Sequence, residues 1–415
     1  MSTSFDLAII GAGIVGLAAA RELLGRHPRL RVAVLDKDSE IGQHQSGHNS
    51  GVIHAGLYYA PGSLKAKLCA EGRDRLYAFC DEQAIPYDRC GKLVVALNES
   101  ELPRLQELYR RGTANGVPGL EMVGQERLRE LEPYSEGVQG IFSPVTGIID
   151  FRQVTAAYAR QVRERGGEIL LNHEVTAISR RQGRVLLRTT HGILDTRHLV
   201  TCAGLYSDRV AQMTGGDVDP KIVPFRGDYF MIRPERRHLV KGMIYPVPDP
   251  AFPFLGVHFT RRMDGEVWLG PNAVLAFARE GYRRLDVNPR DLAETLAYGG
   301  FRTLALKYWR TGLDEMVRDF VKTAFVRELR RYMPELRDED VVSGPSGVRA
   351  QALDAEGKMV DDFAISSSEQ VIHVRNAPSP AATSSLAIGR VIADMADERF
   401  SLEAEDASKR AFGSV

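Results

Sequence analysis

Two histidines and a set of small polar residues fall in one glycine-rich stretch, QSGHNSGVIHAGLYY, from Gln45 to Tyr59. Imidazole is the side chain that most readily takes up or releases a proton near neutral pH, which makes His54 a candidate general base. Glycine lets the main chain approach a ligand closely, and the hydroxyl and amide groups between the glycines can hydrogen-bond to that ligand. We therefore expect this stretch to lie against a bound ligand on which proton chemistry takes place.

A dinucleotide-binding fingerprint precedes this stretch. Gly11, Gly13 and Gly16 follow the apolar run FDLAII and open the run VGLAAARELLGR, which predicts a strand, a tight turn and a helix. The helix N-terminus offers N–H groups to a pyrophosphate. Asp36 ends the next predicted strand and is placed for a ribose hydroxyl, which favours NAD or FAD over NADP. Because the glycine-rich stretch adds a second backbone cradle, the pattern favours FAD.

The composition narrows the class of protein. The 415 residues carry as many acidic as basic side chains, and 44% of them are hydrophobic, which is typical of globular domains. A net charge of zero argues against a nucleic-acid partner. The four cysteines form no CxxC pair, so we predict no metal site, and their small number favours a reducing compartment. Neither a signal-peptide pattern nor a membrane-spanning run is present, so we expect a cytoplasmic protein.

The order of the predicted elements indicates an α/β fold with two domains. A Rossmann-type FAD-binding domain is expected to be discontinuous, because βα patterning returns after two interruptions. The interrupting segments are expected to form an α+β substrate domain with a mixed or antiparallel sheet. The predicted FAD-binding domain comprises residues 1–90, 145–220 and 341–415, and the predicted substrate domain comprises residues 91–144 and 221–340.

Several strings resemble one known family. GAGIVGLAAAREL, QSGHNSGVIHAGLYY, VPFRGDYF, GPSGVRAQAL and HVRNAPSPAATSSLAIG are similar to the L-2-hydroxyglutarate dehydrogenase (oxidase) family, within the D-amino-acid-oxidase-like FAD-dependent oxidoreductases. The resemblance implies non-covalent FAD, oxidation of L-2-hydroxyglutarate to 2-oxoglutarate, and electrons passed to membrane quinone, or to O₂ in vitro. One departure is LLGRHPRLRVAVLD, which is longer than the usual turn between helix and second strand and should lengthen only a surface loop.

Oxidation of a secondary alcohol by a flavin moves a hydride from C2 to flavin N5 and a proton to a base. His54 and His258 are alternative candidates for the base, the latter because it stands in an alternating strand of the predicted substrate domain. Arg349 matches the position at which related FAD oxidases bind a substrate carboxylate, which a guanidinium holds with two hydrogen bonds. These three are the predicted catalytic residues. Further candidates for binding the dicarboxylate substrate are Arg226, Lys92, Tyr245, Tyr59 and Asn272, of which Arg226 and Lys92 are candidates for the far carboxylate or the flavin.

The predicted cofactor site combines the fingerprint with later segments. Family members hold the adenine at the position of Val175, and the residues from Ser379 to Thr383 precede a helix N-terminus that favours the anionic edge of reduced flavin. The predicted cofactor contacts are Gly11, Gly13, Ile14, Val15, Gly16, Asp36, Lys37, Ser46, His48, Asn49, Ser50, Gly51, Val175, Ala203, Gly204, Gly347, Arg349, Ser379, Pro380, Ala381, Ala382 and Thr383.

Residues 291–333 are predicted to be helical, with apolar residues at helical spacing and basic residues between them. A basic amphipathic helix with Trp309 and Phe301 on its apolar face can lie in a membrane interface. That arrangement would deliver electrons to quinone at the inner face of the cell membrane. The alternative, which periodicity alone favours, is a helical hairpin packed on its own domain.

Two other functions stay open at the level of the sequence. A flavin amine oxidase acting on a small amino or imino acid would share the fold and Arg349 but would need no hydroxyl base. A flavin-binding protein with a purely interacting role would leave the histidines and the arginine unexplained.

Overall fold

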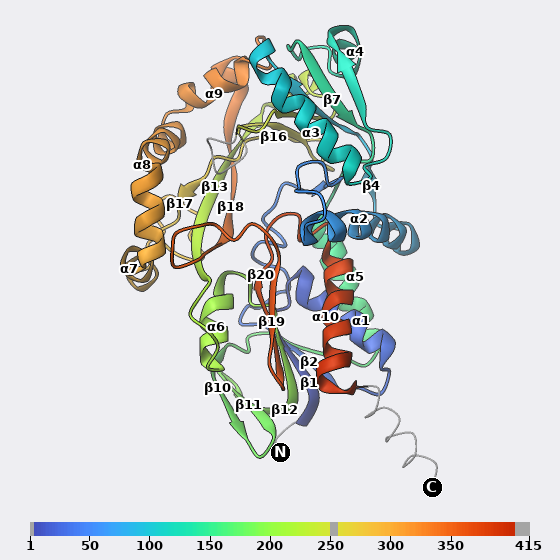
Figure 1. Ribbon diagram of the computed structural model, residues 1–415, viewed down its shortest axis with the longest axis vertical. Helices are drawn as coiled ribbons and strands as arrows, with labels where there is room; N and C mark the ends of the chain where they lie inside the picture. The colour runs from blue at the N-terminus through green and yellow to red at the C-terminus, as the bar shows by residue number, and fades with distance from the viewer. Residues whose placement is uncertain (1–3, 250–255, 403–415) are drawn as a thin grey trace.

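The molecule is elongated, with one large sheet toward each end (Figure 1). The computed structural model describes residues 4–249 and 256–402, and for residues 311 and 313–320 it describes the backbone without the side chains. The ends of the predicted FAD-binding domain, residues 1–3 and 403–415, lie outside the described residues.

The first sheet has the strand order expected of a Rossmann-type domain. Its strands are β1 (Ser4–Ile10), β2 (Val32–Leu35), β9 (Glu168–Leu170), β10 (Val175–Arg181), β11 (Arg184–Thr189), β12 (Gly192–Thr201), β19 (Ala364–Ser367) and β20 (Val371–Asn376). They are ordered β10-β11-β12-β1-β2-β9, with β20 beside β12 and β19 beside β20. The pairs that join β9, β2, β1, β12 and β20 are parallel, and β10, β11 and β19 add antiparallel pairs. Parallel strands are buried on both faces, which is why β1 from Leu7 onward and the whole of β2 are continuous apolar runs.

Three helices cover one face of this sheet (Figure 1). They are α1 (Ile14–Arg26), α5 (Phe151–Glu164) and α10 (Ser385–Phe400). Leu17, Val154 and Ile388, one from each helix, belong to the same buried core as the strands. Gly389 lets α10 approach α1 closely, since a Cβ there would lie 2.8 Å from the Ala18 carbonyl carbon. This packing fixes where the N-termini of α1 and α10 point.

The second sheet joins both segments of the predicted substrate domain. Its strands are β5 (Lys92–Ala96), β6 (Glu121–Gly124), β7 (Gln139–Ser143), β13 (Lys221–Ile232), β14 (Met243–Pro246), β15 (Phe259–Arg261), β16 (Val267–Leu269), β17 (Val274–Leu275) and β18 (Val341–Leu353). They are ordered β17-β13-β16-β15-β14-β5-β7-β6, with β18 also beside β13. The β14–β5 pair is parallel and the others are antiparallel, so the predicted mixed sheet is confirmed.

The predicted boundary at residue 341 does not coincide with a change of sheet. The segment 341–353, assigned from sequence to the first domain, forms β18 and pairs with β13 from Lys221–Leu353 to Ile232–Val341. A long antiparallel partner decides where this strand lies, and that partner cannot be read from the local sequence. The remaining division into two domains stays a prediction.

A three-stranded sheet and four further helices complete these two halves. They are β3 (Val52–Ile53), β4 (Tyr87–Asp88), β8 (Gly147–Ile149), α2 (Leu64–Gln83), α3 (Leu102–Ala114), α4 (Gln125–Leu131) and α6 (Ser207–Met213). Short 3₁₀ turns lie at Glu99–Glu101, Gly204–Tyr206, Pro234–Leu239 and Asp338–Asp340. Helix α2 is capped by Ser63, whose hydroxyl accepts a hydrogen bond from Ala66 N at 3.2 Å. Its Gly72 allows the residues before α10 to lie against it, because a Cβ there would come within 2.5 Å of Ser384 Cα.

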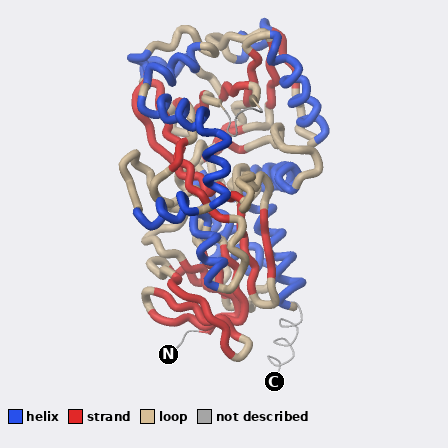
Figure 2. The backbone as a smooth tube through the Cα atoms, turned by 60° about the vertical axis from the view of Figure 1, so that its left-hand side comes forward, coloured by secondary structure: helices blue, strands red, loops and turns tan. Residues whose placement is uncertain are grey.

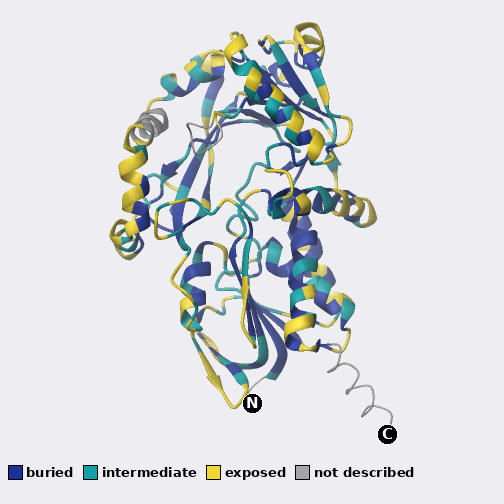
Figure 3. Cartoon of the chain, viewed as in Figure 1, coloured by how far each residue is buried: buried dark blue, intermediate teal, exposed yellow. Residues whose placement is uncertain are grey.

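The predicted helical segment 291–333 forms three helices along one side of the second sheet (Figure 2). They are α7 (Pro289–Ala297), α8 (Gly299–Phe320) and α9 (Lys322–Arg330), and α8 is kinked at Tyr308. Phe301 and Leu304 of α8 pack against Val223 and Leu353 of the sheet, whereas the opposite side of the helix is exposed (Figure 3). Among the described residues, no helix combines the length and apolar character that crossing a bilayer requires.

Candidate active site

A cavity of about 600 Å³ opens at the carboxyl ends of the parallel strands. Gly11 follows β1, Asp36 follows β2 and Cys202 follows β12, and all three residues line the cavity. This is the edge at which open α/β sheets bind ligands. The predicted cofactor contacts that line the cavity are Gly11, Gly13, Ile14, Val15, Asp36, Lys37, Ser46, Val175, Ala203, Gly204, Ala381 and Ala382.

The fingerprint glycines take the positions that their spacing predicts. Gly11 has φ +109°, and a Cβ there would overlap the Cys202 carbonyl oxygen. Gly16 lies outside the cavity lining and has a packing role instead. A Cβ at Gly16 would overlap the Gly11 carbonyl oxygen and push the helix away from the turn. The Asp36 carboxylate accepts a hydrogen bond from Ala12 N at 2.6 Å, and burial raises the pKa of this carboxyl group. Ser46 Oγ accepts one from Ile14 N at 2.9 Å, so the glycine-rich stretch lies against the start of α1.

Charged groups hold one rim of the cavity. The Lys37 ammonium lies 2.5 Å from Glu280 and 2.9 Å from Asp38. His44 Nε2 lies 2.9 Å from Asp38 and 3.2 Å from Glu280. Burial works against a charge on His44, but the two carboxylates outweigh it and raise its pKa to about 9. His44 therefore stays cationic at neutral pH and ties the glycine-rich stretch to the segment before α7.

The next part of the stretch is held by β18. His48 Nδ1 lies 3.0 Å from the Ser346 carbonyl oxygen. A Cβ on Gly347 would lie 2.6 Å from the His48 carbonyl oxygen, so only glycine allows this approach. Asn49 accepts a hydrogen bond from Gly51 N at 2.9 Å and shapes the following turn.

His54 lies where the loop after β3 meets the residues before α10. Its backbone N–H donates to Thr383 Oγ1 at 3.1 Å, and the Thr383 hydroxyl donates to the Val52 carbonyl at 3.3 Å. Its Nε2 lies 3.5 Å from Ser379 Oγ. Its Nδ1 is buried and has no hydrogen-bond partner within the part of the chain that the structure describes. Burial, together with the charge of Lys92, lowers the His54 pKa to about 3, so the imidazole is neutral at pH 7.

His258 is also buried and neutral. Its ring stacks on Tyr245 with ring centroids 4.0 Å apart, and Nδ1 lies 2.9 Å from the Gly256 carbonyl oxygen. A carbonyl can only accept, so Nδ1 carries the proton and Nε2 keeps a lone pair. Burial, followed by the charges of Arg349 and Lys92, lowers the His258 pKa to about 3. The structure thus places both candidate bases within the electrostatic reach of Lys92.

Lys92, at the start of β5, is 1% exposed. Its ammonium nitrogen lies 4.5 Å from the ring centroid of Tyr58 and 4.9 Å from that of Tyr245. Burial lowers its pKa to about 7, with an opposing contribution from Cys69. A lysine in this state gains or loses its charge near physiological pH.

The other predicted substrate residues divide into two groups. Arg349 is exposed on β18, and its charge acts on both His258 and Tyr245. Burial raises the pKa of the Tyr59 hydroxyl, and the Ser379 side chain, which lies beside His54, opposes this rise. Arg226 instead donates to the Asp228 carboxylate at 3.0 and 3.1 Å and to the Arg283 carbonyl at 3.2 Å. Asn272 Oδ1 accepts from Asp228 N at 2.7 Å. Both residues hold the region around β13 through these bonds.

Comparison with known proteins agrees with this arrangement. A family model described as FAD dependent oxidoreductase matches residues 6–395. The mitochondrial L-2-hydroxyglutarate dehydrogenase of Nematostella vectensis is 55% identical over 97% of this chain and 92% of its own. The human mitochondrial enzyme of that name is 49% identical, with coverage of 97% and 90%. The bacterial L-2-hydroxyglutarate dehydrogenase of Indibacter alkaliphilus is 49% identical, with coverage of 95% and 100%.

The chain belongs to the L-2-hydroxyglutarate dehydrogenase family. It is therefore an FAD-dependent oxidoreductase, as the sequence predicts. Among solved structures, an L-alpha-glycerophosphate oxidase from Mycoplasma pneumoniae with FAD bound superposes with a TM-score of 0.77 at 24% identity, covering 93% of each chain. A glycine oxidase from Geobacillus kaustophilus superposes with a TM-score of 0.72 at 18% identity, covering 96% of each chain. At these identities the two neighbours establish the fold, a Rossmann-type FAD domain with a substrate domain.

The cofactor of this family fits the groups that the structure presents. The turn at Gly11 and the start of α1 leave room for a pyrophosphate beside the helix N-terminus. At the start of α10, Ser384 Oγ is buried without a partner among the described residues, which suits a second polar ligand group there. The predicted contacts outside the cavity lining stay predictions; they are Gly16, His48, Asn49, Ser50, Gly51, Gly347, Arg349, Ser379, Pro380 and Thr383.

Sequence reasoning missed two residues that join the glycine-rich stretch to distant segments of the chain. The Arg262 guanidinium carbon lies 4.0 Å from the Trp268 ring centroid, and Nη1 donates to the Asn49 carbonyl at 2.9 Å. Gln45 accepts a hydrogen bond from Ala350 N at 3.1 Å and lines the cavity. Gln45 is the first residue of the glycine-rich stretch, so its role could have been predicted from the sequence. No motif in the sequence around Arg262 indicates a role for that residue.

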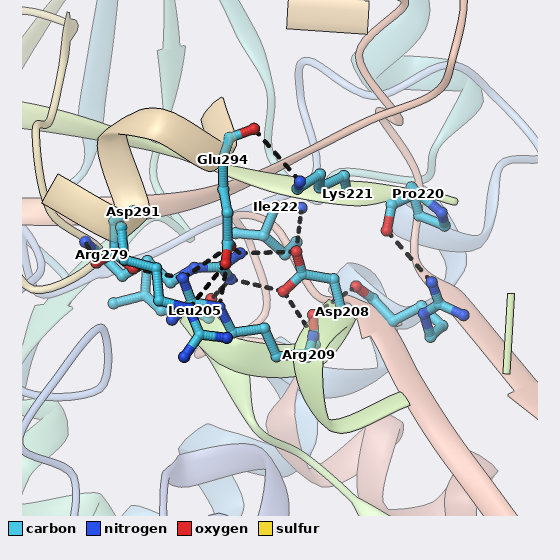
Figure 4. Close-up of polar contacts among 12 residues, drawn as sticks. Leu205, Asp208, Arg209, Pro220, Lys221, Ile222, Arg279, Asp291 and Glu294 are labelled. Carbon is cyan, nitrogen blue, oxygen red and sulfur yellow. Dashed lines mark hydrogen bonds and ion pairs between the residues drawn. The ribbon is translucent and has the colours of Figure 1, made fainter. Parts of the chain in front are cut away.

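A buried ion network supports the cavity wall (Figure 4). Arg279 donates two hydrogen bonds to the Asp208 carboxylate at 2.6 and 2.8 Å, and both side chains are almost fully buried. Arg209 lies 2.5 Å from Asp291 and 2.8 Å from Glu294, which links α6 to α7. Because Arg209 lines the cavity, this network fixes the helices of the second half against the cofactor site.

Proposed function

We propose that this protein oxidises L-2-hydroxyglutarate to 2-oxoglutarate. The observation that carries the proposal is the pair of buried, neutral imidazoles of His54 and His258, both of which lie within the electrostatic reach of Lys92. Relatives 49–55% identical over nearly the whole chain bear the name of this activity. Non-covalently bound FAD would supply the acceptor for the hydride that leaves C2.

Within this proposal, one of the two histidines takes the proton of the substrate hydroxyl. A neutral imidazole is required for this step, and burial keeps both rings neutral. Loss of the hydride from C2 and of the proton from oxygen leaves the C2 carbonyl of 2-oxoglutarate, so atoms and charges balance. Arg349 is proposed to bind the carboxylate next to C2 with two hydrogen bonds and so to fix which face of C2 is presented.

The test is anaerobic reduction of the bound flavin by a panel of acids. L-2-hydroxyglutarate should bleach the yellow absorbance rapidly, whereas D-2-hydroxyglutarate, L-lactate, L-malate and glycine should do so slowly or not at all. Bleaching by glycine or proline in place of L-2-hydroxyglutarate would assign the protein to the amine oxidases instead.

We further propose that the electrons leave to a membrane quinone, with the outer side of α7 and α8 as the contact. Leu296, Leu306 and Trp309 are 50%, 78% and 55% exposed there. Arg310 lies 5.2 Å from the Trp309 ring centroid, and Arg302 is exposed on the same helix, which suits an anionic lipid surface. This face differs from the predicted one, because Phe301 is buried and the side chains of residues 313–320 lie outside the described residues.

Flotation with vesicles that contain anionic lipid and ubiquinone tests this contact. The double variant Leu306→Ser, Trp309→Ser should lose vesicle binding and vesicle-dependent quinone reduction while its flavin is still bleached by substrate. Ile193→Ser removes a comparably exposed apolar side chain from the β11–β12 hairpin and serves as the control. Equal flotation of all three proteins would remove α8 from the proposal.

A further inference from the structure

Lys92 is surrounded by aromatic rings rather than by carboxylates. The Tyr58 and Tyr245 rings lie 4.5 and 4.9 Å from its ammonium nitrogen, and we find no ion pair for it in the described parts of the chain. Lys65 provides the contrast, because its ammonium lies 2.8 Å from Asp361. Burying an unpaired cation is costly, so proteins retain one where a ligand supplies the counter-charge.

Unpaired polar atoms gather beside the same ammonium. The Tyr58 hydroxyl is buried and has no hydrogen-bond partner within residues 4–249 and 256–402, and the same holds for His54 Nδ1. The Tyr245 hydroxyl has a contact of 3.5 Å with Thr260 Oγ1, at the limit of a hydrogen bond. A carboxylate could accept hydrogen bonds from both the ammonium group and the unpaired hydroxyl beside it.

We propose that Lys92 binds the carboxylate at the far end of the substrate, with the Tyr58 hydroxyl as a second donor, and thereby makes the enzyme specific for dicarboxylates. This inference rests on the proposed oxidation of L-2-hydroxyglutarate and adds the residue that selects it over monocarboxylic 2-hydroxy acids. The charges of Arg349 and Lys92 both lower the pKa of His258, so the imidazole lies within the electrostatic reach of both cations. A dicarboxylate with one carboxylate at each cation would then hold C2 near the histidines.

The titratable groups around Lys92 are neutral at pH 7, so a carboxylate of the substrate would be its counter-charge. Cys69 of α2 has its pKa raised to about 12 by burial, and burial also raises the pKa values of Tyr58 and Tyr245. His54 and His258 are neutral. None of these groups is an anion at pH 7. A bound carboxylate should therefore raise the pKa of Lys92, so that binding at pH 8 takes up a proton from solution.

The test compares L-2-hydroxyglutarate with its 5-amide, in which the far carboxylate is replaced by a neutral group. The parent holoenzyme should favour the acid over the amide by about 10- to 100-fold in the second-order rate constant for flavin reduction, the range of one charge-assisted hydrogen bond. Lys92→Met should remove this preference by slowing the acid alone. Lys65→Met, a lysine of similar burial that has its own carboxylate, should keep the preference.

A second measurement needs no variant. Titration of the parent holoenzyme with glutarate, in buffers of different ionisation enthalpy, should show uptake of close to one proton at pH 8 and much less at pH 6. An unchanged acid-to-amide preference in Lys92→Met, or absence of proton uptake at pH 8, would overturn the role of Lys92. Failure of L-2-hydroxyglutarate to bleach the parent enzyme would instead overturn the proposed function, so the two failures can be told apart.

Discussion

The imidazole of His258 stacks on the ring of Tyr245 with their centroids 4.0 Å apart, and the Lys92 ammonium nitrogen lies 4.9 Å from the centroid of the same tyrosine ring. One aromatic ring thus neighbours both a candidate base and a buried cation. The charge of Lys92 also acts on His54, which comes from a loop about 200 residues earlier in the sequence. The four predictions below follow from this arrangement and from the contacts that hold it.

The first prediction concerns the base. His54→Asn and His258→Asn should both retain FAD, and the variant that lacks the base should reduce its flavin about 10²- to 10⁴-fold more slowly at saturating L-2-hydroxyglutarate. Because a base works above its pKa, and both pKa values are lowered to about 3, the saturated rate in the parent should stay flat from pH 5 to pH 8. Stopped-flow reduction measures this rate, and unchanged rates in both variants would exclude both histidines.

The second prediction concerns Arg349. Arg349→Lys should raise the dissociation constant for L-2-hydroxyglutarate by about 10- to 100-fold, because an ammonium cannot make two parallel hydrogen bonds to one carboxylate. The substrate dependence of flavin reduction gives this constant. Arg226→Lys is the control, since Arg226 already bonds to Asp228; it should lower the melting temperature and leave substrate affinity unchanged. The opposite result would exchange the roles of the two arginines.

The third prediction concerns the closure of β18 on the glycine-rich stretch. In Gly347→Ala, the new methyl group would meet the His48 carbonyl oxygen at 2.6 Å, so the loop must shift and FAD affinity should fall at least about tenfold. Gly124→Ala is matched to it, because Gly124 has open space around it and should retain FAD fully. Equilibrium dialysis against free FAD measures both, and equal affinities would show that His48 and Gly347 do not shape the site.

The fourth prediction concerns the stability cost of Lys92. Its folded-state pKa of about 7 lies below its ordinary value of 10.5, so the unfolded chain binds the proton more tightly. The parent should therefore gain stability as pH rises from 7 to 10.5. Lys92→Met should stabilise the substrate-free enzyme by several kcal/mol at pH 6, as an order of magnitude, and by much less near pH 10. Chemical denaturation at the two pH values checks this; a pH-independent effect would contradict it.

The fingerprint could be predicted because each of its roles depends on near neighbours. Gly11, Gly16 and Asp36 act within one βαβ unit, where spacing alone sets the geometry. The sequence could indicate His54 and His258 as candidate bases, but it could not predict that they lie in one region. Their proximity depends on how β3 and β15, which belong to different sheets, are arranged in the fold. Arg226 and Arg349 look alike in sequence, and the bond from Arg226 to the Asp228 carboxylate is seen only in the structure.

The strands whose partners are distant account for the other differences. The segment 341–353 is predicted from sequence to belong to the first domain, yet its backbone pairs with β13. Arg262 reaches Asn49 across more than 200 residues, and no local pattern encodes that contact. Side chains that act through such long-range contacts become visible only once the sheets are assembled.

The cavity is lined by residues from both ends of the chain, from Ile10 to Ser46 and from Val374 to Ala382. A ribosome completes the first of these segments more than 300 residues before the last. The growing polypeptide therefore cannot enclose its cofactor during that part of its synthesis. Enclosure of FAD has to wait until the segment from Val374 to Ala382 has been made, and the cellular supply of FAD at that moment would set the yield of active enzyme.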